Sequence, residues 1–121
     1  MIAQYTQAAL VADNKRLAAP ASVDSIPSSA MQEDHVSMGW SAARKLRAAI
    51  NNLSHIIAIE LVTAARAIEL RAPLTPSPVT QKIISALRET VGGAGSDRYL
   101  SPELRAAQEF VAAGRVMSGL Q

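Results

Sequence analysis

The feature that most constrains this chain is a long, uninterrupted helical pattern over residues 35–71. The segment contains no proline, and its one glycine, Gly39, lies near the start. Apolar residues recur in steps of three and four and form a continuous stripe: Leu46, Ile50, Leu53, Ile57, Leu61, Ala64 and Ile68. This is the period of an amphipathic α-helix, which would be ~50 Å long at about 1.5 Å per residue. The sequence therefore predicts one long helix.

The face opposite this stripe is not cleanly polar. It mixes apolar residues with polar ones: Ile59, Val62 and Leu70 beside His55, Arg66 and Glu69. A helix that is apolar over most of its circumference requires neighbours on several sides. The other helices predicted here are too short to supply them all. We therefore expect other chains to pack against the long helix in an oligomeric helical bundle.

Shorter helices are predicted on both sides of the long one. Ser77 followed by Pro78, and Ser101 followed by Pro102, each pair an N-cap residue with a proline at the first helical position. No segment shows the alternation of a β-strand. The expected fold is therefore all-α, with one long central helix and shorter flanking helices. We expect a single domain over residues 1–121, made of helices over residues 1–17, 35–71, 78–91 and 101–114 and a loop over residues 18–34.

Composition and charge exclude several classes of protein. The net charge is +2, and lysine and arginine are scattered, so a nucleic-acid partner is not expected. There is no cysteine, which excludes disulfides and thiolate chemistry. No apolar run approaches the ~20 residues that span a bilayer, and the N-terminus does not have the pattern of a signal peptide. We therefore expect a cytoplasmic protein without a membrane partner.

The segment over residues 18–34 lacks helical periodicity. It contains Pro20, Pro27 and several serines, and it is rather apolar for a loop in solvent. A non-repetitive stretch of ~15 residues or more in a compact chain is often functional. We expect this loop to be buried or half-buried, with its polar groups satisfied inside the protein.

The loop and the start of the long helix carry a long motif. Residues 20–39 read PASVDSIPSSAMQEDHVSMG. This motif resembles that of the histidine ammonia-lyases, in the aromatic amino acid lyase family. The agreement continues on both sides, at Gln4-Tyr5-Thr6, Asn14-Lys15, Arg44-Lys45-Leu46 and Arg71-Ala72-Pro73-Leu74. One departure is Ala19, where many relatives have histidine. The resemblance covers nearly the whole chain, which would correspond to the C-terminal portion of such an enzyme.

The resemblance implies elimination of ammonia from L-histidine to give urocanate, a step of histidine catabolism. The electrophile of this family is a methylidene-imidazolone (MIO) ring that forms from an internal Ala-Ser-Gly. That tripeptide is absent here, because Ser22 is followed by Val23 and Ser118 is preceded by Met117. We therefore expect the ring in an N-terminal part outside this chain, and we expect the isolated chain to be inactive. The resemblance also implies a homotetramer whose sites are shared between subunits.

Glu33 matches the family's active-site glutamate, and Gln32 matches the amide beside it. We therefore predict Glu33 as a catalytic and substrate-binding residue and Gln32 as a substrate-binding residue. An imidazole offers N–H donors, which a carboxylate accepts strongly in a dry pocket. Relatives acting on phenylalanine or tyrosine have an amide in place of this glutamate, so Glu33 favours histidine. Spacing alone favours a helix cap for this acidic cluster, and with the resemblance we assign the cap to Asp34.

Two alternatives stay open from the sequence. One is a related lyase or aminomutase acting on phenylalanine or tyrosine. The other is a non-catalytic helical oligomerisation fragment, which the absence of Ala-Ser-Gly supports. A metal site is not expected, because the acidic residues and His35 are adjacent while His55 lies many turns away. Ser28 and Ser29 have no histidine placed near them, so we expect turn roles for both.

Overall fold

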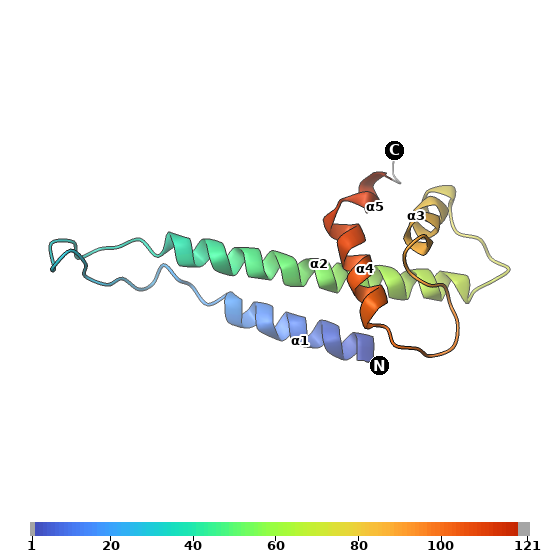
Figure 1. Ribbon diagram of the computed structural model, residues 1–121, viewed down its shortest axis with the longest axis horizontal. Helices are drawn as coiled ribbons and strands as arrows, with labels where there is room; N and C mark the ends of the chain where they lie inside the picture. The colour runs from blue at the N-terminus through green and yellow to red at the C-terminus, as the bar shows by residue number, and fades with distance from the viewer. Residues whose placement is uncertain (1, 119–121) are drawn as a thin grey trace. The chain divides into compact units, whose positions relative to one another are not determined.

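The computed structural model describes residues 2–118, which are mainly helical (Figure 1). The elements are α1 (Ile2–Leu17), α2 (Gly39–Glu69), α3 (Pro78–Arg88), α4 (Ser101–Ala112) and α5 (Arg115–Ser118). Over these residues the chain forms no strand, and Ser28 and Glu33 form an isolated antiparallel bridge. The predicted all-α class, with one long helix and shorter helices, is confirmed.

The helix ends differ from the predicted ones. α2 begins at Gly39 rather than at residue 35, and α3 and α4 end two or three residues earlier than predicted. The short helix α5 was not predicted. It is separated from α4 by Gly114, whose φ of +70° lies in the left-handed region that glycine adopts without strain. Apart from α5, the differences are confined to element boundaries, where local sequence signals are weakest.

The chain divides into two compact units, Met1–Leu53 and Ser54–Gln121. Helix α2 begins in the first unit and ends in the second. Because α2 belongs to both units, this division does not separate the chain into two domains. The single domain expected over residues 1–121 stays a prediction.

The first unit is held together by polar contacts. Asn14 Nδ2 donates a hydrogen bond to the carbonyl oxygen of Ala49 at 3.4 Å, and Asn52 Nδ2 donates to Asn14 Oδ1 at 2.9 Å. The Lys45 ammonium donates to the carbonyl oxygen of Ala19, just after α1. None of the described residues up to Leu53 is buried. These side chains therefore tie α1 and the loop to the N-terminal half of α2 without a hydrophobic core.

The hydrophobic core lies in the second unit. It combines side chains of α2, α3 and α4 with a residue just after α3: Ala58, Ala65, Ile84, Leu87, Val91, Ala107 and Phe110. Ile59, on the side of α2 opposite the predicted stripe, is also buried, with 3% of its surface exposed. The C-terminal half of α2 therefore has neighbours on more than one side, as the sequence predicted.

The start of α3 has the predicted cap. Ser77 Oγ accepts a hydrogen bond from the backbone N–H of Thr80 at 3.3 Å, and Pro78 is the first helical residue. At α4 the expectation was wrong, because the helix already includes Ser101. Leu100 is the N-cap residue there, and its side chain makes no capping hydrogen bond.

The apolar stripe of α2 is largely exposed toward the N-terminal end of the helix. The exposed fraction is 61% for Leu46, 54% for Ile50 and 48% for Leu53. By length and composition, α2 would also be able to cross a bilayer. The expectation that no apolar segment is long enough to span a bilayer was therefore wrong. This is weak evidence, because core helices of water-soluble proteins pass the same test. The helix also carries Glu60, and a charge at the centre of a bilayer costs about 2.5–3.5 kcal/mol.

Candidate active-site loop

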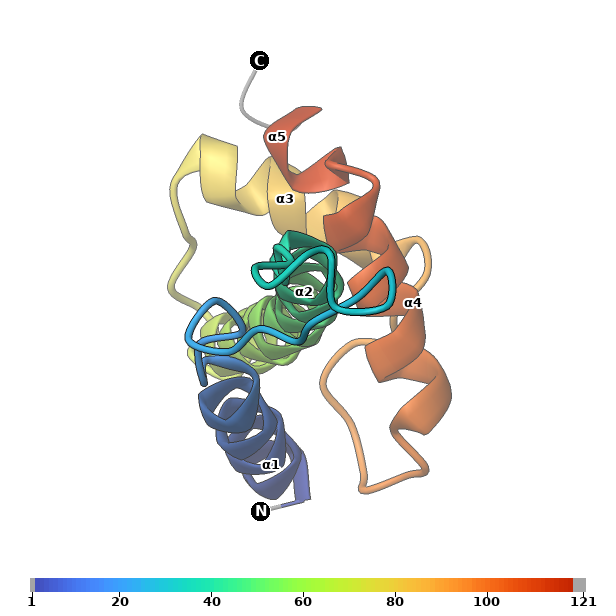
Figure 2. The same ribbon diagram turned by 90° about the vertical axis from the view of Figure 1, so that its left-hand side faces the viewer.

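The predicted site residues lie in the loop between α1 and α2, residues 18–38. The loop extends beyond the first turn of α2 (Figure 1), and Figure 2 shows it from the loop end of that helix. We expected this loop to be buried or half-buried, and in this chain by itself that expectation was wrong. The exposed fraction is 78% for Val23, 55% for Ile26 and 80% for Met31. Apolar side chains in water favour contact with further protein surface.

Ser25 holds the base of the loop. Its Oγ accepts a hydrogen bond from the Val36 N–H at 2.8 Å and donates to the Val36 carbonyl oxygen at 3.2 Å. The Asp24 carboxylate accepts from the Ser25 N–H at 2.8 Å, in a local Asx contact. Because both backbone groups of Val36 bond to Ser25, this segment does not join the helix. The late start of α2 therefore has a defined cause.

The capping role predicted for Asp34 was wrong. Asp34 lies five positions before Gly39, the first residue of α2, which is too far for its side chain to cap the first turn. Ser37 takes part instead, because its Oγ accepts a hydrogen bond from the Gly39 N–H at 3.2 Å. Gln32 and Glu33 lie farther still from the helix start, so the capping alternative does not apply to them either.

The tip of the loop is a tight hairpin from Ser28 to Glu33. The Ser28 N–H donates to the Glu33 carbonyl oxygen at 2.8 Å, and the Glu33 N–H donates to the Ser28 carbonyl oxygen at 3.2 Å. Between them, three consecutive non-glycine residues have positive φ: Ser29 at 53°, Ala30 at 53° and Met31 at 67°. The left-handed conformation costs an L-residue about 1–2 kcal/mol. Strain of this kind clusters at functional sites, where the surrounding structure maintains it.

The hairpin brings Gln32 and Glu33 to the second arm of the tip, where both are exposed. The Gln32 N–H closes the turn by donating to the Ser29 carbonyl oxygen at 3.1 Å. Ser28 Oγ donates to Glu33 Oε2 at 3.1 Å. Among residues 2–118, Ser28 is the partner of the Glu33 side chain, and Oε1 makes no hydrogen bond there. A carboxylate held in this way can accept a further N–H from a bound molecule.

Sequence reasoning gave Ser28 only a turn role and did not connect it with Glu33. It also did not identify the two-way contact of Ser25 with Val36. Neither contact has a signal in the sequence, because the partners are five and eleven residues apart within an irregular loop. No helical or strand period fixes which side chains meet across such a loop.

An open cavity of about 370 Å³ lies at the start of the loop. Residues of α1, the loop and α2 line it, including Leu17, Ala19, Pro20, Lys45, Leu46 and Ala49. Ala19 is the residue at which we expected a departure from the family's motif. The contact it makes with Lys45 uses its backbone carbonyl. This contact therefore does not depend on the side chain at residue 19.

Possible metal ligands do not gather in the part of the chain that the structure describes. No group of three or more histidine, cysteine, aspartate or glutamate side chains is placed to hold an ion there. Glu33, Asp34 and His35 are consecutive and exposed, whereas His55 lies on α2.

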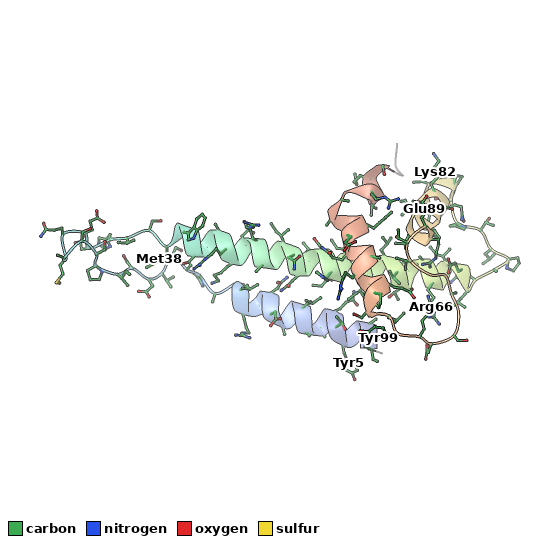
Figure 3. All side chains as sticks on the ribbon, in the orientation of Figure 1. Tyr5, Met38, Arg66, Lys82, Glu89 and Tyr99 are labelled. Atoms are coloured by element: carbon green, nitrogen blue, oxygen red, sulfur yellow. The ribbon has the colours of Figure 1, made fainter. Side chains whose placement is uncertain are left out.

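Charged residues of the second unit pair with one another around residues 92–95. Arg88 donates to Glu69 from both Nε and Nη2, and the Ala94 N–H donates to the same carboxylate at 2.9 Å. The hydrogen bond from Arg88 lowers the pKa of Glu69, and the backbone hydrogen bond from Ala94 adds to this. Arg66, which lies beside the chain leading to Tyr99 (Figure 3), donates to the Gly95 carbonyl oxygen at 2.9 Å. These contacts indicate a structural role for Glu69, because Arg88 and Ala94 already bind both of its carboxylate oxygens.

The family model for aromatic amino acid lyases matches residues 1–89, which include α1, the loop, α2 and α3. The chain belongs to the aromatic amino acid lyase family. A histidine ammonia-lyase of Streptomyces avermitilis is 65% identical over 122 residues, which cover 100% of this chain and 24% of that relative. The resemblance noted from the motif of the loop is thus confirmed.

Solved structures agree with this assignment. The crystal structure of histidine ammonia-lyase from Trypanosoma cruzi matches with a TM-score of 0.93 and 40% identity, over 98% of this chain and 24% of that one. A tyrosine aminomutase from Streptomyces globisporus matches with a TM-score of 0.89 and 33% identity, over 98% of this chain and 22% of that one. The chain therefore spans about a quarter of the length of the lyases that it matches.

Proposed function

We propose that this chain is the C-terminal part of a histidine ammonia-lyase, which eliminates ammonia from L-histidine to give urocanate. The observation that carries the proposal is Glu33, an exposed residue at the tip of a strained hairpin whose Oε1 makes no hydrogen bond within residues 2–118. The 65% identical relative, itself a histidine ammonia-lyase, supports the same activity. In this proposal Gln32 and Glu33 form part of the substrate site.

The chemistry of the two side chains suits an imidazole. A neutral imidazole has one N–H donor and one nitrogen acceptor, and the protonated ring has two donors. The Glu33 carboxylate accepts such a donor, while the Gln32 amide can donate or accept. A hydrogen bond to an ionised group is roughly twice as strong as one between neutral groups. The proposed role of Glu33 is therefore to bind and orient the imidazole ring. A carboxylate in this position also suits a general base that accepts a proton during elimination.

The exposure of Gln32 and Glu33 supports the proposal that other protein surfaces complete the site. Water competes for an exposed carboxylate and weakens its attraction to a ligand, whereas exclusion of water strengthens it. Val23, Ile26 and Met31 give the same loop apolar surface that further walls of a pocket would cover. The chain thus supplies one wall of the proposed site.

The residues of this chain cannot form the MIO ring that the family resemblance implies. The ring needs Ala-Ser-Gly, and the sequence contains no such tripeptide. The role proposed for this chain is therefore limited to holding the substrate, and we expect the chain by itself not to convert histidine.

We further propose that the complete enzyme is a cytoplasmic homotetramer. Leu46, Ile50 and Leu53 support an association of this kind, because they leave an apolar stripe of α2 exposed. Helices of other copies would cover this stripe and form the bundle predicted from the sequence.

The alternative with structural support is an aminomutase or lyase acting on tyrosine or phenylalanine. The fold match with a tyrosine aminomutase favours it at the level of architecture. Glu33 argues against this alternative. The family resemblance implies that relatives acting on tyrosine or phenylalanine have an amide in place of this glutamate. A non-catalytic helical fragment is the remaining alternative.

The test is a comparison of substrates with a full-length protein that contains this chain. L-Histidine, L-phenylalanine and L-tyrosine are supplied separately, and urocanate is followed by its near-ultraviolet absorption. We expect kcat/KM for histidine to exceed the other two by at least ~100-fold, because a site built to pair with N–H groups rejects a ring without them. A β-amino acid formed from tyrosine would identify the aminomutase, and inactivity toward all three would favour the non-catalytic alternative.

A further inference from the structure

We propose that Ser28 is a positioning residue for Glu33, and that its hydroxyl and backbone together set the direction of the Glu33 carboxylate. This inference rests on the proposed function of Glu33. Ser28 does not need to touch the substrate, because it acts on the group that does.

The two residues are joined by three hydrogen bonds. Two link their backbones in both directions, at 2.8 and 3.2 Å, and the third joins Ser28 Oγ to Glu33 Oε2 at 3.1 Å. In an antiparallel pair, residues that exchange both backbone hydrogen bonds have side chains on the same face. The isolated bridge therefore brings the hydroxyl next to the carboxylate.

The hairpin needs this closure because its turn is strained. Ser29, Ala30 and Met31 all have left-handed φ values, which non-glycine residues keep only where neighbouring contacts hold them. Met31 is largely exposed, so packing of its side chain within this chain does not hold it. The two backbone hydrogen bonds between Ser28 and Glu33 hold the turn in this conformation. The hydroxyl of Ser28 adds a side-chain hydrogen bond to them. Loss of that bond would free the carboxylate to rotate.

The hydroxyl also distinguishes the two carboxylate oxygens. Ser28 Oγ is the donor to Oε2, because an ionised carboxylate can only accept. Oε1 is then the oxygen presented to an N–H of the imidazole ring. A carboxylate fixed in one rotamer loses less conformational entropy when it binds a ligand than a mobile one does.

The experiment is a double-mutant cycle in the full-length enzyme, with kcat/KM for histidine as the measured quantity. The variants are Ser28→Ala, Glu33→Gln and the combination of the two. Ser28→Thr keeps a hydroxyl. Ser22→Ala is the matched control, at an exposed serine of the same loop that lies outside the hairpin and whose hydroxyl makes no hydrogen bond within residues 2–118. Melting temperatures are measured for every variant.

We expect Ser28→Ala to lower kcat/KM about 10-fold, as for loss of a hydrogen bond to a charged group, with the melting temperature nearly unchanged. Ser28→Thr should recover most of the activity, and Ser22→Ala should behave like the unmodified enzyme. In the Glu33→Gln background Ser28→Ala should have little further effect, since residues that act through one another are not additive.

Three results would overturn the inference. The first is an undiminished effect of Ser28→Ala in the Glu33→Gln background, which would show that Ser28 acts independently. The second is full activity of Ser28→Ala together with impaired activity of Glu33→Gln. This result would contradict the role of Ser28 but would keep the proposed role of Glu33. The third is full activity of Glu33→Gln, which removes the proposed function of Glu33 as well and is thereby distinguished from the other two.

Discussion

Arg88 and Glu69 form a two-point ion pair, in which Nε lies 2.6 Å from Oε1 and Nη2 lies 3.1 Å from Oε2. The pair links α3 to the last residue of α2, and its side chains are only 16% and 27% exposed. The Ala94 N–H donates to the same carboxylate, which fixes the segment after α3. All three contacts are strongest when Glu69 is ionised, because an ionised carboxylate is the better hydrogen-bond acceptor.

We predict that the second unit loses stability in acid. Hydrogen bonding to Arg88 lowers the pKa of Glu69, and hydrogen bonding to Arg98 lowers the pKa of Glu103. A group whose pKa is lowered by folding contributes stability above its unfolded value, about 4.3 for glutamate, and loses it as the pH falls through the folded value. Urea unfolding between pH 7 and pH 3 would measure this, and the decline should be shallower for Glu69→Gln. Glu109→Gln, at an exposed position of α4, is the control and should follow the unmodified chain. Equal slopes for all three proteins would contradict the prediction.

A second prediction concerns the strain at Met31. Its φ is 67° and its side chain is 80% exposed, so glycine would relieve the backbone while losing little packing. Relief of about 1–2 kcal/mol is partly offset by about 0.4–1 kcal/mol of added entropy in the unfolded chain. We expect Met31→Gly to slow amide hydrogen exchange at Gln32 and Glu33 several-fold. Val23→Gly, at an exposed loop position without positive φ, should give no such protection. Faster exchange in Met31→Gly would show that the turn is not strained.

The third prediction tests Glu33 directly in the full-length enzyme. Glu33→Gln keeps the size of the side chain but removes its charge, so a charge-assisted hydrogen bond worth ~1.5–3 kcal/mol should be lost. We expect kcat/KM for histidine to fall at least ~10–100-fold and discrimination against phenylalanine to shrink. The melting temperature should hardly change, because Glu33 is exposed and does not cap α2. Unchanged histidine kinetics with a lowered melting temperature would make Glu33 a structural residue.

The fourth prediction is that the purified chain self-associates. Leu46 and Ile50 are more than half exposed on α2, and apolar surface gains about 25 cal/mol per Å² when it leaves water. Sedimentation velocity at micromolar concentration should show species larger than a monomer. The combined variant Leu46→Lys with Ile50→Lys should weaken the association, whereas Ala48→Lys, about half a turn away from Leu46, should not. A monomer at this concentration would contradict the prediction.

Several features of the fold and the site followed from sequence alone. The period of apolar residues predicted α2 as a single long helix, and Ser77 with Pro78 predicted the start of α3. These signals are local, because a helix is specified by contacts three and four residues apart. The motif of the loop singled out Glu33 and the family, because a run of residues is compared directly without knowledge of how the loop is folded.

The conformation of the loop was decided by tertiary structure. The late start of α2 depends on Ser25 meeting Val36, and the direction of Glu33 depends on Ser28 and three left-handed residues. The sequence likewise predicted an apolar helix, but only packing against α3 and α4 determined that Ala58 and Ala65 are buried. The physical reason is common to all of these. Helical propensity acts within one turn, whereas hydrogen bonds across a loop and contacts in a core form only once the chain has brought distant residues together.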